Sequence, residues 1–333
     1  MKNKKGWKVG KGARIVRSKI QARQVEIGEG STLAGVHITA PSLSVGKDSR
    51  LEECKLFSTD GPIRIGDGVN IKERSVLNAF RGISIGDRTI IDRDVFVGGM
   101  QSEKSELAVG SDCVILYRSY LNTTRKITIG NGTGVGGYVR IFTHSAWQNA
   151  LTGNPVRFAD VNLGNDVWIA WDITIMPGVT VHDKATVGTG ALVTKDIPPD
   201  CIAVGVPARV VKDRTREPQD LPDKNRLMID ILNDFEGYAA SFLKLRVSLK
   251  TTRDSCIVRM PHNRVLEFRP FLEDFKEPDS KSVLISFRIP NAIKRGGTEW
   301  VELDTLSAKA PSATEFIEFI RRYGVRILQA DKR

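Results

Sequence analysis

The sequence has few cysteines and no long apolar run. Its four cysteines, Cys54, Cys113, Cys201 and Cys256, lie far apart and form no CxxC pair. This spacing argues against a disulfide framework or a zinc site and favours reduced thiols, and hence the cytoplasm. No segment approaches the roughly 20 apolar residues of a membrane span, and no signal-peptide core follows the N-terminal lysines. We therefore expect an unsecreted, cytoplasmic protein that folds without cross-links.

Acidic residues are absent from the start of the chain. Residues 1–24 contain nine lysines and arginines but no aspartate or glutamate, whereas the whole chain has a net charge of +11. The other 309 residues are nearly balanced, with 41 basic and 39 acidic side chains. Such a segment could make weak contact with a membrane surface or an anionic polymer, although a solvated end is the simpler interpretation. We predict no specific nucleic-acid binding.

A short motif recurs through the first two hundred residues. It has an apolar residue first, Ile, Val or Leu third and Gly fourth, and it occurs nine times between WKVGKG (7–12) and VTVHDK (179–184), where His182 replaces the glycine. Successive copies are 18, 18, 20, 20, 24, 20, 34 and 18 residues apart. The excess over 18 always falls at the end of a copy: 61–62, 81–82, 101–106, 125–126 and 145–160. A solenoid tolerates insertions that are restricted to one corner.

The pattern within each copy indicates the type of coil. Apolar positions alternate, and many residues are β-branched, which predicts short strands. Glycine followed by Asp, Asn or Lys predicts turns with unusual backbone angles. Three strands and three turns per 18 residues make a mainly β domain, a triangular parallel β-helix of about nine coils, within residues 1–214.

This repeat resembles that of the hexapeptide-repeat acyltransferases. The resemblance is closest over 161–210, which contains VWIA, PGV, TKDIPP and GVPARV and is similar to the end of sugar O-acetyltransferases of the maltose, galactoside and capsule-modifying type. It implies a left-handed β-helix, although general connection rules favour the opposite hand. It further implies acetyl-CoA as the acyl donor and a homotrimer with active sites between subunits.

The longest insert begins directly after His144. Moving an acyl group from a thioester to a hydroxyl requires a base, and imidazole, with an unperturbed pKa of about 6.5, is suited to that role. In the family a histidine that ends a coil beside an extended loop is the base, so the resemblance assigns general-base catalysis with direct transfer to His144. A turn histidine held by local hydrogen bonds is the alternative. The sequence does not identify the group that orients His144.

The other three histidines are dispersed. His37, His182 and His262 lie in different parts of the chain. A zinc site like that of the γ-class carbonic anhydrases, which share this scaffold, needs three histidines that meet at a subunit boundary. We therefore predict no metal.

The resemblance also assigns binding residues by position. The residues expected to line acetyl-CoA either follow strands of the last coils or bring positive charge to its phosphates. They are Ala170, Trp171, Thr189, Thr194, Lys195, Arg209 and Lys212. Trp171 departs from the family, whose residue here is small. Those expected near the acceptor are Asn122, which could match an asparagine of relatives, and three residues of the loop: Trp147 for stacking on a sugar, and Asn149 and Arg157 for hydroxyls or a carboxylate.

The pattern changes after a polar, proline-bearing linker at 215–223. Residues 224–333 begin with Leu227, Ile231, Phe235, Tyr238 and Phe242 at helical spacing. Alternating segments follow at 244–250, 256–260, 264–268, 282–289 and 298–304, and a helix is expected near 312–323. This indicates a smaller α+β domain, whose role the sequence does not reveal.

The prediction is thus an acetyl-CoA-dependent O-acetyltransferase that acts on a hydroxyl of a sugar or glycan precursor in surface polysaccharide synthesis. Transfer to an amino sugar is an alternative within the same chemistry. A non-catalytic solenoid that binds an anionic polymer is an alternative from another class.

Overall fold

The computed structural model of the 333-residue chain describes residues 6–145, 148–213, 224–252, 255–269, 282–286, 289, 299–303, 307–320 and 328–329. The predicted linker 215–223 and Trp147 lie outside these residues. The chain divides into two compact units, Met1–Pro218 and Gln219–Arg333.

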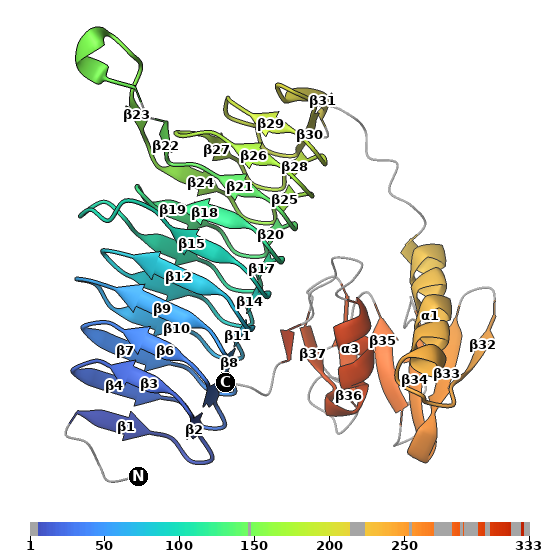
Figure 1. The fold of residues 1–333 in the computed structure, drawn as a ribbon. Helices are drawn as coiled ribbons and strands as arrows, with labels where there is room; N and C mark the ends of the chain where they lie inside the picture. The colour runs from blue at the N-terminus through green and yellow to red at the C-terminus, as the bar shows by residue number, and fades with distance from the viewer. Residues whose placement is uncertain are drawn as a thin grey trace. The chain divides into compact units, whose positions relative to one another are not determined.

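The first unit is a solenoid with three sheets, whose strands are parallel except for the antiparallel pair of β30 and β31 at one end (Figure 1). The first sheet contains β1 (Trp7–Val9), β4 (Gln24–Ile27), β7 (Ser42–Val45), β10 (Ile63–Ile65), β13 (Ile83–Ile85), β16 (Leu107–Val109), β19 (Ile127–Ile129), β24 (Val161–Leu163) and β27 (Thr180–Val181). The second contains β2 (Arg14–Val16), β5 (Thr32–Ala34), β8 (Arg50–Glu52), β11 (Asn70–Ile71), β14 (Ile90–Ile91), β17 (Val114–Ile115), β20 (Gly134–Val135), β25 (Trp168–Ile169), β28 (Thr186–Val187), β30 (Cys201–Val204) and β31 (Arg209–Asp213). The third contains β3 (Lys19–Gln21), β6 (His37–Thr39), β9 (Lys55–Ser58), β12 (Val76–Ala79), β15 (Phe96–Gly98), β18 (Tyr120–Asn122), β21 (Arg140–Ile141), β26 (Thr174–Ile175) and β29 (Leu192–Val193).

Each coil takes one strand from each sheet in turn. We call the turn between the first and second sheets the first corner, that between the second and third sheets the second corner, and that between the third and first sheets the third corner. Inward-facing aliphatic side chains of successive coils stack in register, as Ile63 does on Ile83, and both are almost fully buried. This continuous core confirms the predicted mainly β solenoid. Its left hand stays a prediction from the resemblance.

The repeat glycines lie at the first corner, and the reason for them differs from the one predicted. They do not have positive φ angles; that conformation belongs to residues two positions later, such as Gly12 and Asp112. A Cβ atom on Gly110 would instead lie 2.6 Å from Asn131 Oδ1 and 2.7 Å from Asn131 N in the next coil. Glycine is therefore required because adjacent coils approach each other closely.

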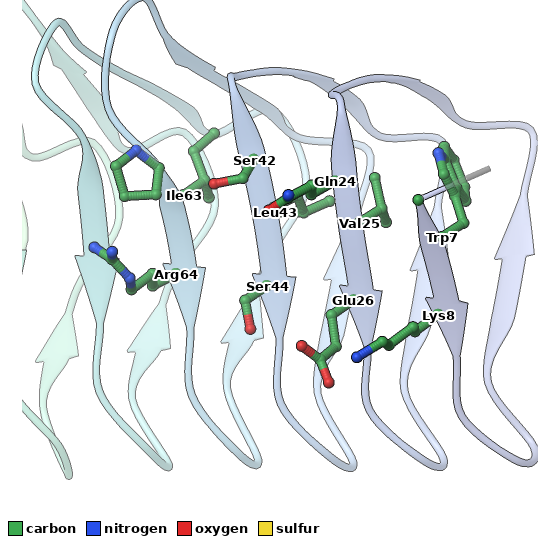
Figure 2. A pocket seen from close by; sticks show the side chains of 12 residues that line it. Trp7, Lys8, Gln24, Val25, Glu26, Ser42, Leu43, Ser44, Ile63 and Arg64 are labelled. Carbon is green, nitrogen blue, oxygen red and sulfur yellow. The ribbon is translucent and has the colours of Figure 1, made fainter. Parts of the chain in front are cut away.

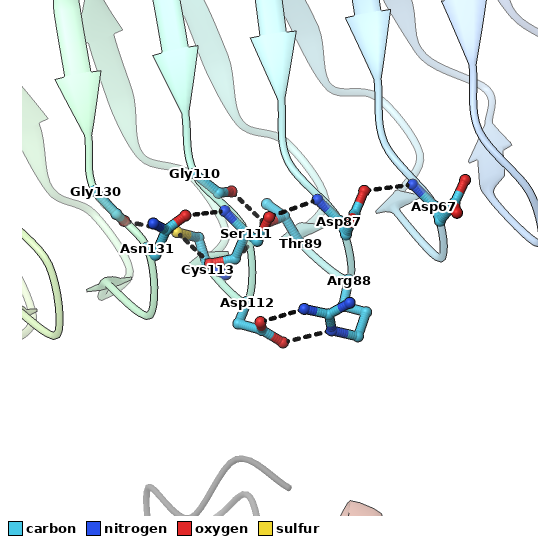
Figure 3. Close-up of polar contacts among 10 residues, drawn as sticks. All are labelled: Asp67, Asp87, Arg88, Thr89, Gly110, Ser111, Asp112, Cys113, Gly130 and Asn131. Carbon is cyan, nitrogen blue, oxygen red and sulfur yellow. Dashed lines mark hydrogen bonds and ion pairs between the residues drawn. The ribbon is translucent and has the colours of Figure 1, made fainter. Parts of the chain in front are cut away.

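The residue after each repeat glycine ties two coils together. Asp87 Oδ1 accepts a hydrogen bond of 2.9 Å from Asp67 N, and Asn131 Oδ1 accepts one of 2.8 Å from Ser111 N (Figure 3). These side chains satisfy backbone N–H groups that face the next coil at a turn, where no strand can pair with them. In the Gly-Asp and Gly-Asn pairs of the sequence, the glycine thus allows the close approach of two coils at this corner, and the Asp or Asn supplies the hydrogen bond between them.

All five inserts lie at the third corner, between a strand of the third sheet and the next strand of the first sheet. The longest forms an antiparallel ribbon of β22 (His144–Ser145) and β23 (Arg157–Phe158), with the 3-10 turn η1 (Ala150–Thr152) at its far end. Figure 1 shows this ribbon extending away from the stacked coils.

The second unit is an α+β unit. It contains α1 (Lys224–Ser241), β32 (Ser248–Thr251), β33 (Cys256–Met260), η2 (Pro261–Asn263), β34 (Arg264–Phe268), β35 (Ser282–Ser286), β36 (Glu299–Glu302), β37 (Ser307–Lys309), η3 (Pro311–Ala313), α3 (Thr314–Ile320) and β38 (Leu328–Gln329). The strands form one sheet in chain order. The helices α1 and α3 meet through Phe235, which packs edge-on against Phe316 with ring centroids 5.4 Å apart.

The buried face of α1 differs from the predicted one at both ends. Leu227 and Phe242 are exposed, whereas Met228, Leu232 and Ala239 are buried together with Ile231 and Phe235. Phe242 lies beyond the end of the helix and stacks on Tyr238. The face of α1 that packs in the core is thus rotated about the helix axis relative to the face predicted from the sequence.

The four cysteines are free and buried. Among the described helices, none combines the length and the hydropathy that a membrane crossing requires.

Candidate active site

His144 lies where the regular coil ends and the ribbon begins. It follows β21 at the third corner and pairs with Phe158 across the ribbon, while Ser145 pairs with Arg157. The preceding residue, Thr143, is fully buried and donates a hydrogen bond of 2.6 Å to the carbonyl oxygen of Asn122 in the coil before it. His144 is therefore held by the solenoid on one side and opens onto the insert on the other.

The imidazole of His144 is bonded to Asn122. His144 Nδ1 lies 3.0 Å from Asn122 Oδ1, which also accepts a hydrogen bond of 3.2 Å from the backbone N–H of Thr124. Because a backbone N–H can only donate, its contact identifies the amide oxygen of Asn122. The Nδ1 atom of His144 must then be the donor, and the lone pair of the neutral ring is on Nε2. None of the described residues bonds to Nε2.

Asn122 is itself fixed. Its side chain is 3% exposed, and its Nδ2 atom donates a hydrogen bond of 2.8 Å to the hydroxyl of Tyr120. Both ends of the amide therefore have partners within the solenoid. The structure therefore places the amide of Asn122 where it can orient the imidazole of His144. The sequence did not identify a group for this role.

A ring beside His144, and a cation that contacts this ring in turn, were not predicted. Phe158 stacks on the imidazole with ring centroids 6.0 Å apart and planes 17° apart. The Arg125 guanidinium carbon lies 4.8 Å from the Phe158 ring centroid. Phe158 reaches His144 through the antiparallel register of the ribbon, and no sequence repeat encodes that register.

Of the predicted acceptor residues of the loop, the two that the structure describes do not bring their side-chain polar groups to His144. Asn149 caps η1, where its Oδ1 accepts a hydrogen bond of 3.0 Å from Leu151 N, and it is exposed. The backbone of Arg157 is next to the histidine in the ribbon, but its guanidinium packs against Gly178 of the following coil. Trp147 lies outside the described residues.

The predicted donor residues lie at two corners. Ala170, Trp171 and Thr189 follow strands of the second sheet and occupy the second corner, whereas Thr194 and Lys195 follow β29 and occupy the third corner, as His144 does. Arg209 and Lys212 lie on the antiparallel strand β31. Thr189, Thr194, Lys195, Arg209 and Lys212 are exposed, and Ala170 is buried. Within one chain, the third sheet therefore separates His144 from the second-corner group.

Trp171 packs along the second corner. Its ring meets Tyr117 edge-on with centroids 5.3 Å apart, and it covers Gly137, where a Cβ atom would lie 2.5 Å from the Trp171 ring. The bulky residue is accommodated because the coil below it has glycine at that position. This explains how the chain accommodates Trp171 at a position where the resemblance leads us to expect a small residue.

Aromatic rings on the outer face of the third sheet lead toward His144. Phe96, which is 46% exposed, stacks on Tyr120 with centroids 5.7 Å apart, and Tyr120 contacts Phe142 at 5.8 Å. At the third corner of the earlier coils lies a hollow of about 710 Å³, lined by residues that include Asn78 and Gln101. Both features share the face or the corner that carries Asn122 and His144.

The remaining histidines are far apart along the chain. His37 packs edge-on against Phe57 in the third sheet, His182 is exposed at the first corner, and His262 is in the second unit. Among the residues that the structure describes, no three His, Cys, Asp or Glu side chains could together hold a metal ion.

Known proteins resemble the chain over limited stretches. No family model matches it. It is 40% identical over 74 residues to galactoside O-acetyltransferase of Escherichia coli strain K12, which is 19% of this chain and 36% of that protein. It is 38% identical over 106 residues to a chloramphenicol acetyltransferase of Agrobacterium fabrum, which is 32% of this chain and 47% of that protein. The solved polysialic acid O-acetyltransferase OatWY aligns with a TM-score of 0.41 at 16% identity, over 67% of this chain and 98% of that one.

The chain thus spans less than half the length of these two curated relatives. The matches nevertheless agree with the resemblance that the repeat and the segment 161–210 predicted. Over these stretches the chain is similar in sequence to known acetyltransferases.

Proposed function

We propose that this protein transfers the acetyl group of acetyl-CoA to a hydroxyl of a sugar or glycan precursor, with His144 as the general base. The observation that supports this most directly is the hydrogen bond between His144 Nδ1 and Asn122 Oδ1, because it leaves the lone pair of the neutral ring on Nε2. The relatives named above are acetyltransferases, and one of them is an O-acetyltransferase of a galactoside.

The proposed reaction is a direct transfer. The acceptor hydroxyl gives its proton to Nε2 of His144 as its oxygen attacks the thioester carbonyl. The tetrahedral intermediate collapses, the C–S bond breaks, and the thiolate of CoA takes the proton back from the imidazolium. Asn122 keeps Nδ1–H bonded throughout, so it holds the tautomer and stabilises the imidazolium that forms in between. We infer that backbone amides near the insert stabilise the oxyanion.

We further propose that the site is completed between subunits of a homotrimer. Ala170, Trp171 and Thr189 lie at the second corner, and His144 lies at the third corner. If three prisms pack side by side around an axis parallel to the long axis of each prism, the third corner of one protomer meets the second corner of the next. The donor would then be held by one protomer and deprotonation carried out by its neighbour. The exposed Lys195, Arg209 and Lys212 fit the phosphates of CoA by charge.

The acceptor would approach over the third sheet. Aromatic rings such as Phe96 and Tyr120 offer stacking surfaces for sugar rings, and Asn78 and Gln101 offer amide groups for hydroxyls. These groups continue for three coils below His144, which favours an oligosaccharide or glycan precursor over a single sugar. The buried free thiols fit a reducing compartment such as the cytoplasm.

The decisive experiment measures release of free CoA from acetyl-CoA with a panel of hydroxyl sugars, amino sugars and glycan oligosaccharides. The expected result is turnover with hydroxyl acceptors that is lost in His144→Ala. Turnover with amino sugars alone would favour N-acetyl transfer. Absence of both CoA binding by calorimetry and turnover would reject the enzyme in favour of a binding solenoid.

A further inference from the structure

The first coil of the solenoid carries a ring of positive charge. Its side chains Lys8, Arg14 and Lys19 lie on β1, β2 and β3, and so one cation lies on each of the three sheets. Three more lie at the corners: Lys11 at the first, Arg17 at the second and Arg23 at the third. All six are exposed, and none forms an ion pair with a described residue.

The ring is one coil deep. The next coil, residues 24–41, contains Glu26 and Glu29 but no lysine or arginine. Figure 2 shows Glu26 beside Lys8 on the outer face of the first sheet, where the two residues are in register on adjacent strands without an ion pair. Positive charge therefore surrounds the end of the prism and is interrupted at the next coil.

The same end exposes apolar side chains. Val9, whose register partner in the next coil is the buried Ile27, lies on the inward-facing row and is 44% exposed. Trp7, Ile15 and Ile20 are only partly buried against the core of the solenoid. An apolar centre within a basic ring is the arrangement that favours the interface of an anionic bilayer, where cations meet lipid phosphates and apolar groups enter the headgroup boundary.

We propose that the first coil docks the solenoid end-on to an anionic membrane surface. A flat surface perpendicular to the prism axis would meet cations from all three sheets and all three corners together. A linear anionic polymer would instead need a track of cations along one face, and the acidic second coil interrupts any such track. This docking does not depend on the proposed acetyl transfer, although a glycan precursor carried on a lipid would then lie at the same surface.

The test uses the full chain in a vesicle co-sedimentation assay. Vesicles of phosphatidylcholine alone are compared with vesicles that also contain phosphatidylglycerol, at low and at high salt. We expect binding to the anionic vesicles only, with loss at high salt. The variant K8Q/R14Q/K19Q, which removes one cation from each sheet, should bind about 100-fold more weakly, because each cation near such a surface contributes about fivefold.

The matched control is K47Q/K55Q/K104Q, which removes three exposed lysines from later coils and should bind within a few-fold of wild type. Each single variant, K8Q, R14Q and K19Q, should weaken binding to a similar extent if the contact is planar. Equal losses in the two triple variants would overturn the proposal, and so would binding to soluble polyphosphate without binding to vesicles. Acetyl transfer to a soluble acceptor should be unchanged in K8Q/R14Q/K19Q, so a failure of docking can be distinguished from a failure of the proposed function.

Discussion

The Nδ1 atom of His144 and the Oδ1 atom of Asn122 lie 3.0 Å apart, although the two residues are 22 positions apart in the chain. The contact arises because Asn122 ends β18 of one coil and His144 follows β21 of the next. It determines which nitrogen of the ring can accept a proton.

Replacing His144 by alanine should lower kcat by about 10²- to 10⁴-fold, the usual contribution of a positioned base. The KM for acetyl-CoA should change only a few-fold, because the proposed donor residues are untouched. Steady-state kinetics of CoA release measure both. His182→Ala is the matched control, because His182 is exposed at the first corner. A kcat within a few-fold of wild type in His144→Ala would show that another group is the base.

Asn122→Ala should lower kcat by roughly 10- to 100-fold, a part of the effect of the base, since the ring loses the partner that orients it. Asn122→Asp should restore most of the rate, because a carboxylate can accept from Nδ1–H and from the Tyr120 hydroxyl. A purely structural role would give equal losses in both variants. Thermal unfolding of Asn122→Ala should also show a loss of about 1–3 kcal/mol, because the buried N–H of Thr124 loses its acceptor.

Lys195→Gln and Arg209→Gln should each raise the KM for acetyl-CoA by about 10-fold, the effect of losing one charge-assisted hydrogen bond, with little change in kcat. Binding of the donor is affected in the ground state and the transition state alike. Lys104→Gln, at another exposed lysine, is the control and should leave KM unchanged. An unchanged KM in both variants would remove these residues from the donor site.

Gly110→Ala should destabilise the solenoid by about 1–3 kcal/mol, because its Cβ atom would collide with Asn131 of the next coil. Gly237→Ala, in α1, has no neighbour within 4 Å of the added Cβ and should stabilise its own unit by up to about 1 kcal/mol. Urea unfolding of the two variants measures the difference in sign. Equal effects would contradict the steric explanation of the repeat glycines.

The stability of the solenoid should fall at alkaline pH through Cys54. Burial raises the pKa of this thiol from 9.0 to about 12. The unfolded chain therefore loses this proton first, so the contribution is complete below pH 9, declines as the pH rises, and is lost by about pH 12. In Cys54→Ala, which also leaves a small cavity, the deficit relative to wild type should narrow by at most about 1.4 kcal/mol per pH unit over this range. A constant deficit between pH 9 and pH 11 would contradict the buried thiol.

The sequence predicted the solenoid well because its repeat records a physical requirement at every coil. Ile63 and Ile83 occupy equivalent positions of two copies and stack in the core. The inserts were also predictable, since they are the departures from the period. The prediction that the repeat glycines are needed for unusual backbone angles was wrong, because the period identifies a position but not the contact made there. Gly110 faces the next coil and has an ordinary φ angle.

The geometry of the candidate site could be predicted only in part. The sequence singles out His144 by its place at the end of a coil, and its role as the base stays a prediction. The partners of His144 depend on geometry that the repeat does not contain. Asn122 aligns with Phe142 in the period and reaches His144 only because the chain leaves the coil at the ribbon. Phe158 faces His144 through the register of an antiparallel pair inside an irregular insert. The face of α1 was misplaced for a related reason, since Phe242 continues a helical spacing beyond the last residue of the helix.

Because all inserts lie at the third corner, the length of an insert can change independently of the stacking of the coils. A segment added there lengthens the chain between two strands without moving either of them, so the stacking of later coils is preserved. A residue added inside a strand would reverse which side chains point inward for the remainder of that strand. The insert 145–160 can therefore change in length while the coils beneath it stay the same.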